Sequence, residues 1–313
     1  MPLNRGALFD PVLVADLIDR VKGKSSLAKL SKQEPIPFNG QKEFIFTMDS
    51  EVDVVAESGA KSHGGVDLTP IIIQPIKVEY GARVSDEFMY AAEDEKIAIL
   101  KAFNDGFAKK VARGLDLMAF HGVNPRTGQP STVIGQNHFD GLVQQEVQAG
   151  VGLPDPNQAV ENAIALVYGA DNDVTGMAMS PIFRSALAAQ SDANGLPMFP
   201  ELAWGNAPES IKGLPVDVNR TVSDMARNAE RAYVGDFENA FKWGYAKEIP
   251  LEIIEYGDPD NSGNDLKGYN QVYLRAEVYL GWGILDPEAF ARIVEAGGVD
   301  ATQDPNQPDP NQA

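Results

Sequence analysis

The feature that most restricts the fold is a long amphipathic run between Glu93 and Gly122. Acidic residues crowd its start, basic residues follow, and Gly122 supplies a stop. Its apolar side chains recur every three or four residues, the period of one helix face: Ile97, Leu100, Phe103, Phe107, Val111, Leu115 and Met118. At about 1.5 Å per residue this helix spans about 43 Å, longer than the ordinary helix of a compact domain. Gly106 and Gly114 allow a bend within it.

Extended chain precedes this helix, from Pro35 to Tyr80. Three segments there have strand character, and a turn-rich stretch from Glu57 to Gly65 separates the last from the others. The segments are Glu43–Met48, Val52–Val55 and Leu68–Tyr80. Pro70 and Pro75 lack a backbone donor, so they suit an edge strand. The pattern predicts a long hairpin, and because a hairpin by itself buries little surface, such a projection needs a partner.

After a loop from Asn124 to Ser131, the pattern alternates between helix and strand. We expect one helix from Pro156 to Tyr168 and a second that Ser180 caps and Pro181 opens. The expected strands are Gly176–Ser180, Gly213–Val218, Arg231–Phe237, Glu248–Tyr256 and Asn270–Leu285. Helices and strands in this order predict an α+β fold.

Both ends of the chain differ from its middle. Asp10 caps a predicted helix that ends at Gly23, and its apolar stripe is too short to fold alone. The first 34 residues carry six basic side chains against four acidic ones, which suits either an arm docked on a neighbour or a solvated face. The tail from Asp300 repeats the letters DPNQ, and its Pro and Asn content predicts disorder.

Composition excludes several classes of protein. The net charge of -19 argues against a protein that grips nucleic acid through its phosphates, because that mode needs a surplus of Lys and Arg. The chain has no cysteine, and its three histidines, His63, His121 and His138, supply a zinc site poorly. No stretch reaches the roughly 18 apolar residues of a membrane span, and the N-terminus lacks an export signal. We therefore expect a cytosolic chain without a membrane partner.

Two short patterns suggest catalysis, and for each the structural interpretation is the stronger one. Ser26 and Lys29 fit the S-x-x-K pattern of serine acyl enzymes, but the companion motifs are missing, so a surface Ser and Lys are expected. His121 suits a general base, yet a histidine at the end of a helix also stabilises the negative end of the dipole.

Two segments begin like calcium-binding loops, Asp171–Gly176 and Asp258–Gly263. Ile182 and Tyr269 stand where such a loop needs a bidentate glutamate, so ordinary turns are expected. We assign no catalytic, cofactor-binding or metal-binding residue, and we predict that the chain is not an enzyme.

An extended hairpin, then a long helix, then an α/β region that ends in a long strand is the element order of the Hong Kong 97 capsid fold. Five segments also resemble that family in their residues: Gly81–Glu95, Met179–Pro200, Gly213–Val222, Val234–Ile254 and Val272–Phe290. Over nearly its whole length, from about Leu8 to Ile293, the chain resembles the major capsid proteins of tailed bacteriophages.

The resemblance implies a division of the chain. Its parts are an N-terminal arm (1–34), an extended β-hairpin E-loop (35–80), a peripheral domain with the long spine helix (81–145), an axial domain (146–240), late strands that return to both domains (241–300) and a disordered tail (301–313). In that family the axial domains meet around the five-fold and six-fold axes, and each E-loop lies across a neighbour's peripheral domain.

The resemblance also implies a role and partners. Hexamers and pentamers would self-assemble in the host bacterial cytoplasm into the icosahedral capsid of a virion, which encloses double-stranded phage DNA without specific binding. A portal, a separate scaffolding protein and a protease are the implied partners. Some members crosslink a Lys with an Asn, for which Lys61 at the hairpin tip is a candidate by position only. Two alternatives stay open: an encapsulin-like nanocompartment shell, and a serine hydrolase that uses Ser26 and Lys29.

Overall fold

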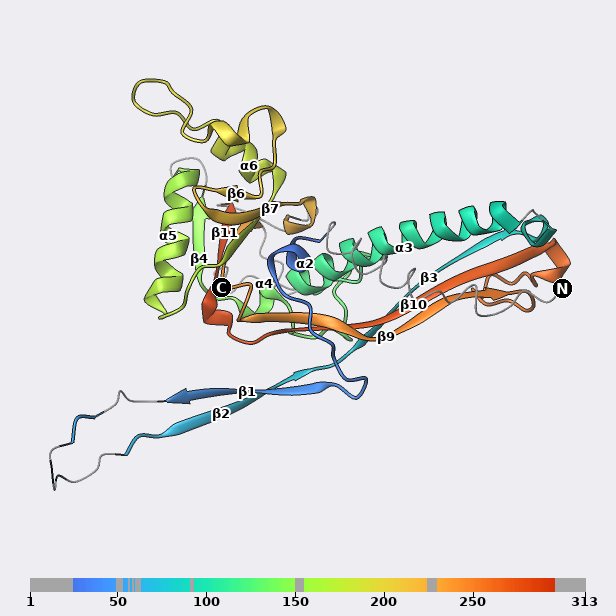
Figure 1. Cartoon of the computed structure of the whole chain (residues 1–313), viewed down its shortest axis with the longest axis horizontal. Helices are drawn as coiled ribbons and strands as arrows, with labels where there is room; N and C mark the ends of the chain where they lie inside the picture. Colours follow the sequence, from blue (N-terminus) through green and yellow to red (C-terminus); the bar gives the residue numbers. More distant parts are fainter. Residues whose placement is uncertain are drawn as a thin grey trace, which may run out of the picture.

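The computed structural model of the chain describes residues 25–48, 53–55, 57, 59, 63–90, 93–149, 155–223 and 230–295. Two bodies and a projecting hairpin are the main parts of the described structure (Figure 1). A three-stranded sheet with the long helix α3 forms the three-stranded body, and a six-stranded sheet with helices α5 and α6 forms the six-stranded lobe. The hairpin of β1 and β2 projects away from both. Two clusters of buried apolar side chains make up the core. One lies within the six-stranded lobe, and the other, centred on the three-stranded body, also includes Ala178, Tyr233 and Phe290 of the six-stranded sheet.

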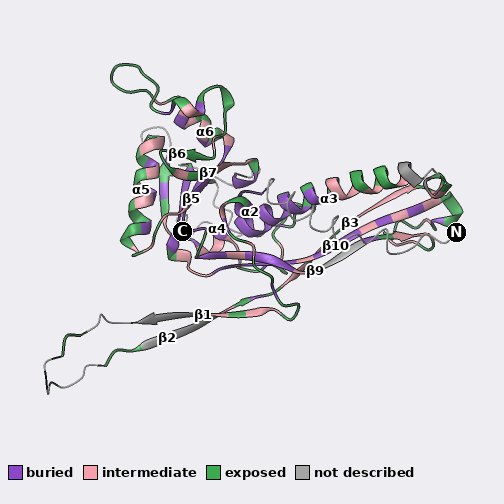
Figure 2. Ribbon diagram, viewed as in Figure 1, coloured by how far each residue is buried: buried purple, intermediate pink, exposed green. Residues whose placement is uncertain are grey.

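The long helix predicted from the sequence is confirmed as α3 (Glu93–His121), 29 residues that continue through Gly106 and Gly114. Its second half is buried, with Phe107 and Leu115 in the core of the three-stranded body. Its first half is not, since Figure 2 colours much of that end as exposed. Ile97 is 58% exposed although it lies on the predicted apolar face, and Leu100 and Phe103 pack only at the edge of the core. The apolar face of α3 is fully covered only along its second half, and periodicity along one helix cannot show where that cover ends.

The sheet of the three-stranded body has the order β3-β10-β9 and is antiparallel throughout. Its strands are β3 (Ile76–Ser85), β10 (Gln271–Ile284) and β9 (Phe241–Ile254). The predicted strand 270–285 is therefore confirmed, whereas the predicted strand 248–256 begins seven residues earlier, at Phe241. Short elements flank these strands and α3. The 3-10 turn η2 (Asp86–Tyr90) links β3 to α3, and η5 (Lys267–Tyr269) precedes β10. The short helix α4 (Phe139–Leu142) follows α3, and the 3-10 turn η6 (Pro287–Ala289) follows β10.

The hairpin consists of β1 (Gln41–Met48) and β2 (Val66–Ile73), which pair in antiparallel register with Phe44 opposite Pro70. The single strand predicted over 68–80 is in fact two strands, because the extended strand is interrupted at Gln74 and Pro75. β2 then pairs with β1, and β3 pairs with β10. The strand expected at 52–55 is wrong for residues 53–55, which lie outside any strand. Pro70 lies in a two-stranded ladder, where every strand is an edge.

The six-stranded lobe has the strand order β4-β11-β8-β5-β7-β6. Its strands are β4 (Glu146–Ala149), β11 (Phe290–Glu295), β8 (Glu230–Gly235), β5 (Gly176–Met179), β7 (Leu214–Val218) and β6 (Ser210–Ile211). Three of them, β5, β7 and β8, were predicted, but β4, β6 and β11 were not. β11 arrives from the far end of the chain and lies inside the sheet, between β4 and β8.

Helices α5 (Pro156–Gly169) and α6 (Pro181–Ala188) cover this sheet and confirm both helix predictions. The Ser180 side chain caps α6 by accepting a hydrogen bond from the Phe183 amide, as expected. Two 3-10 turns lie nearby, η3 (Pro200–Gly205) and η4 (Arg220–Val222). The short helix α2 (Ser26–Leu30) was not predicted, and its Leu27 is fully buried in the core of the three-stranded body.

Several sequence-based expectations lie outside the described residues. They concern the helix from Asp10 to Gly23, Lys61 and the tail from Asp300. Within the described ranges, none of the helices is both long and apolar enough to cross a membrane.

Candidate interaction surfaces

The root of the hairpin crosses closely over β9 and β10. The Glu34 amide donates to the Trp243 carbonyl oxygen at 2.9 Å, so the chain before β1 runs along the edge of β9. Glycine makes this crossing possible, because a Cβ at position 244 would lie 1.7 Å from the Glu34 carbonyl oxygen. A Cβ on Gly283 would likewise lie 2.7 Å from a side-chain carbon of Ile73, which is itself buried. The root is therefore a tight backbone crossing and not a free hinge.

Ion pairs also hold the root of the hairpin against β9. The Lys242 ammonium lies 3.1 Å from a carboxylate oxygen of Glu34 and 3.5 Å from one of Glu43. The hydrogen bond to Glu34, followed by the charges of both carboxylates, raises the pKa of Lys242 against the opposing effect of burial. One lysine of β9 thus holds both the segment before the hairpin and its first strand.

Beyond the root the hairpin offers an uncovered apolar face. Phe44 is 57% exposed and Ile72 is 51% exposed, on strands that pair only with each other. Val54, between the two strands, is 94% exposed. A two-stranded ribbon with apolar side chains in water is marginal by itself, so this surface is a candidate for contact with a partner.

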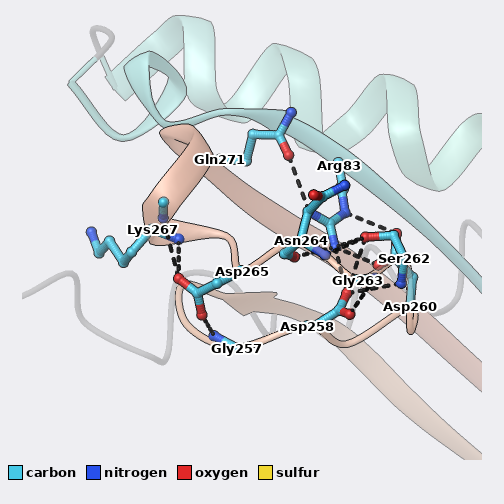
Figure 3. A network of polar contacts seen from close by, with 11 residues as sticks. Arg83, Gly257, Asp258, Asp260, Ser262, Gly263, Asn264, Asp265, Lys267 and Gln271 are labelled. Atoms are coloured by element: carbon cyan, nitrogen blue, oxygen red, sulfur yellow. Dashed lines mark hydrogen bonds and ion pairs between the residues drawn. The ribbon is translucent and has the colours of Figure 1, made fainter.

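A second projection, the loop between β9 and β10 (255–270), has the opposite character. Arg83 reaches into it from β3 (Figure 3) and donates to Asp260 from its Nε at 2.9 Å. Its Nη2 donates to Asp258 at 2.7 Å and to the Asn264 carbonyl oxygen at 2.9 Å. Hydrogen bonding to Arg83 and its charge hold the pKa of Asp260 well below its usual range. The loop is therefore folded by contacts within one subunit.

This loop contains one of the two sequences that begin like calcium-binding loops, and its Asp258 carboxylate already accepts hydrogen bonds from the protein. Asp258 accepts hydrogen bonds from the backbone amides of Ser262 and Gly263 at 3.0 and 2.7 Å, besides that from Arg83. In the other sequence, the Thr175 hydroxyl donates to Asp236. Ordinary turns are the better description of both. Across the described ranges, no group of three or more His, Asp or Glu side chains is placed to hold a metal ion.

The serine of the S-x-x-K pattern is not a surface residue, contrary to expectation. Ser26 is fully buried, and its hydroxyl donates to an Asp217 carboxylate oxygen at 2.6 Å. The Lys29 ammonium lies 3.0 Å from the other oxygen of the same carboxylate. Both side chains therefore tie α2 to β7. The geometry gives Lys29 the role of a counter-ion for Asp217.

His121 also takes part in a buried network. Its Nδ1 lies 2.8 Å from a carboxylate oxygen of Asp140, and its Nε2 lies 2.8 Å from the Thr221 carbonyl oxygen. The Tyr233 hydroxyl donates to the second oxygen of Asp140. These contacts join α3, α4, η4 and β8, so His121 has a structural role at the junction of the two bodies.

Sequence reasoning missed the most buried carboxylate of this junction, Asp116. It accepts hydrogen bonds from the hydroxyls of Ser25 and Thr221 and from the backbone amides of Ser26 and Leu27. Burial raises the pKa of Asp116 to about 6, although these donors oppose the rise. The available signal was a lone acid inside the apolar run that ends α3. Arg83 gave no comparable signal, because its partners lie about 175 residues away in sequence.

The chain is similar to known proteins in both its sequence and its fold. The model of the phage capsid family matches residues 6–294. A chain from Mycobacterium phage Ogopogo is 32% identical with a TM-score of 0.74, and the match covers 87% of this chain and 92% of that one. A chain from Gordonia phage Cozz is 26% identical with a TM-score of 0.72, covering 87% of each. A capsid chain of an empty GTA particle shares the fold at 18% identity and a TM-score of 0.62, covering 88% of this chain and 97% of that one. No match was found among curated proteins.

Proposed function

The chain belongs to the phage capsid family and is a structural major capsid protein whose copies form an icosahedral shell, and we propose that its hairpin β1–β2 is the arm that binds a neighbouring subunit. The expected α+β class and Hong Kong 97-type fold are confirmed. The same similarities point to a structural protein, located in the virion capsid.

One observation supports the role of the hairpin most strongly. Its root is held by glycine-mediated crossing and by Lys242, while its outer strands expose Phe44 and Ile72 and pair only with each other. An arm that is fixed at one end and apolar at the other suits a surface outside its own subunit. In the shell that surface is the three-stranded body of a neighbour, so we identify the hairpin with the E-loop.

The two bodies suit two further roles. The three-stranded body with α3 is the peripheral domain in this proposal, and the six-stranded lobe is the axial domain that meets its copies around the five-fold and six-fold axes. The apolar cluster of the six-stranded lobe supports this division, because it contains no described residue of β3, β9 or β10. Subunits arranged in this way make the hexamers and pentamers of a closed shell.

The partners follow from the same role. The shell encloses double-stranded DNA without gripping it, in agreement with the net charge of -19. A portal, a scaffolding protein and a protease are the partners that assembly in the host cytoplasm would need. The similarity to phage and GTA chains favours this role over a nanocompartment shell. The buried Ser26, bonded to Asp217, favours a structural role over a hydrolase.

Removal of the hairpin tip tests the proposal. The variant lacks residues 52–66 and joins the flanking strands with a short Gly and Ser linker. We expect the subunit to keep its secondary structure and to melt cooperatively, because the tip adds nothing to either core. Assembly should fail, since a loss of about 1 to 2 kcal/mol at each contact is repeated over the many interfaces of a shell. Circular dichroism and sedimentation velocity measure the two effects.

Phe107→Ala in α3 is the matched control, because Phe107 is 3% exposed in the core of the three-stranded body. The cavity should lower the free energy of unfolding by about 3 to 5 kcal/mol and reduce soluble protein. If the hairpin deletion unfolded the subunit while Phe107→Ala did not, the hairpin would belong to the core, and its role as an arm would be refuted.

A further inference from the structure

Trp204 lies at the corner of a tight turn that follows α6. The Asn206 amide donates to the Ala203 carbonyl oxygen at 3.1 Å, which closes a four-residue turn over Trp204 and Gly205. Trp204 has φ 57° and ψ 27°, and Gly205 has φ 84°. These angles fit a type I′ turn, whose first corner normally holds Asn, Asp or Gly because the left-handed region disfavours a large side chain.

Buried side chains and hydrogen bonds of the same lobe hold the turn in place. Leu202 is fully buried, and Phe199 is 4% exposed. The Asn206 side chain donates to the Glu201 carbonyl oxygen at 2.8 Å, and Arg184 donates from α6 to the Asn206 carbonyl oxygen at 3.2 Å. These contacts fix the direction of the turn without using the indole ring.

The indole itself is fully exposed to solvent. The chain has three tryptophans, and the other two, Trp243 and Trp282, are each 1% exposed in the core of the three-stranded body. The subunit thus holds a large apolar ring in water on a backbone conformation that disfavours it. Neither feature stabilises the isolated subunit, and together they present a rigid anchor, the kind of residue that dominates protein interfaces.

The charge of the six-stranded lobe excludes nucleic acid as the partner of Trp204. Residues 155–223 carry eight acidic side chains and three basic ones. Such a surface repels nucleic acid and also repels its own copies. Lobes of this sign that meet in a shell therefore need an apolar contact to hold them, and Trp204 supplies one.

We propose that Trp204 anchors the six-stranded lobe of one subunit to the lobe of a second copy of this chain. The inference rests on the proposed meeting of these lobes in the shell, and it names the residue that holds them. The hairpin and Trp204 then act at different interfaces of the same subunit.

The tryptophan distribution provides a direct test. Acrylamide should quench Trp204 in free subunits and leave the two buried tryptophans largely untouched. In assembled particles of the full chain, Trp204 should become protected and its emission should shift to shorter wavelength. Trp204→Phe marks which part of the signal belongs to this residue. Particles in which acrylamide still reaches Trp204 would overturn the proposal and leave the capsid role intact.

Two variants separate binding from folding. Trp204→Gly removes the anchor but suits the left-handed backbone, so the subunit should melt at an equal or higher temperature. Its yield of particles should fall by about tenfold or more. Trp204→Phe keeps an aromatic ring and should restore most of that yield. Normal particle yield from Trp204→Gly, or a subunit that it destabilises, would refute the anchor. A wild-type chain that remained monomeric with a quenchable Trp204 would refute both the anchor and the proposed assembly.

Discussion

The hairpin β1–β2 and the loop at 255–270 both project from the three-stranded body, yet they are completed in different ways. The loop closes on its own subunit, with Arg83 bound to two aspartates and with Leu266 fully buried. The hairpin is fixed only at its root, and its outer strands expose Phe44 and Ile72. The loop therefore has its final shape before assembly, whereas in the proposed assembly the hairpin gains its cover from another subunit.

The difference lies in the chemistry of the two projections. The loop is polar, and polar groups can pair locally with one arginine and a few backbone amides. The hairpin is apolar on its open face, and apolar groups gain free energy only when a surface covers them. Two neighbouring isoleucines, one arginine and one buried acid allow this contrast to be tested.

The largest effect should come from adjacent isoleucines at the end of β2. Ile73 is 1% exposed at the root, whereas Ile72 is 51% exposed on the other side of the strand. Ile73→Asp buries a carboxylate in an apolar crossing and should lower the free energy of unfolding by about 4 kcal/mol or more. Ile72→Asp should change it by less than about 0.5 kcal/mol but should reduce assembly.

Urea denaturation followed by circular dichroism measures the stability of both isoleucine variants, and sedimentation velocity measures their assembly. Equal losses of stability would mean that the outer face of the hairpin is covered within its own subunit. Normal assembly of Ile72→Asp would mean that this face does not bind a neighbour.

A smaller, local effect is expected from Arg83→Met. Without the guanidinium, Asp258 and Asp260 repel each other and the loop should open, while the core below it stays folded. An aspartate-directed endoprotease should then cut between residues 255 and 265 about tenfold faster or more. Arg275→Met is the control, because Arg275 pairs with Glu252 on the open sheet surface and not with the loop. Equal cutting rates in both variants would show that the loop does not depend on Arg83.

The smallest effect concerns pH and separates Asp260 from Asp116. The pKa of Asp260 is lowered, so its charge and the loop contacts persist as the pH falls from 7 to 5. The pKa of Asp116 is raised to about 6, above that of an aspartate in the unfolded chain. The folded chain therefore takes up a proton in this range and the unfolded chain does not. As the pH falls from 7 to 5, protonation of Asp116 should raise the free energy of unfolding by on the order of 1 kcal/mol.

Urea midpoints at the two pH values, compared with those of Asp116→Asn, isolate this contribution. The comparison is needed because burial lowers the pKa of His138, which works in the opposite direction. A variant with the same pH slope as the wild type would show that Asp116 does not titrate here. Faster loop cleavage at pH 5 would show that the Asp260 contacts are weaker than their geometry indicates.

Sequence alone determined the local elements of this protein. The period of α3, the start of α5 at Pro156, the Ser180 cap of α6 and the long strand β10 depend on residues within a few positions of one another. The order of these elements, with the residues of five segments, also led to the capsid family. Patterns of this kind can be recognised without knowing which distant residues each element contacts, because they follow from backbone periodicity and capping.

Only the tertiary structure decided which elements meet. In the tertiary structure Ile97 is exposed, and β11 lies inside a sheet. The strand expected at 68–80 is divided into β2, which pairs with β1, and β3, which pairs with β10. The tertiary structure also brought Arg83 to the loop and Asp116 to the segment before β1. Each outcome depends on contacts between residues far apart in the chain, and no local pattern specifies which distant surface will cover an apolar face or pair with a charge.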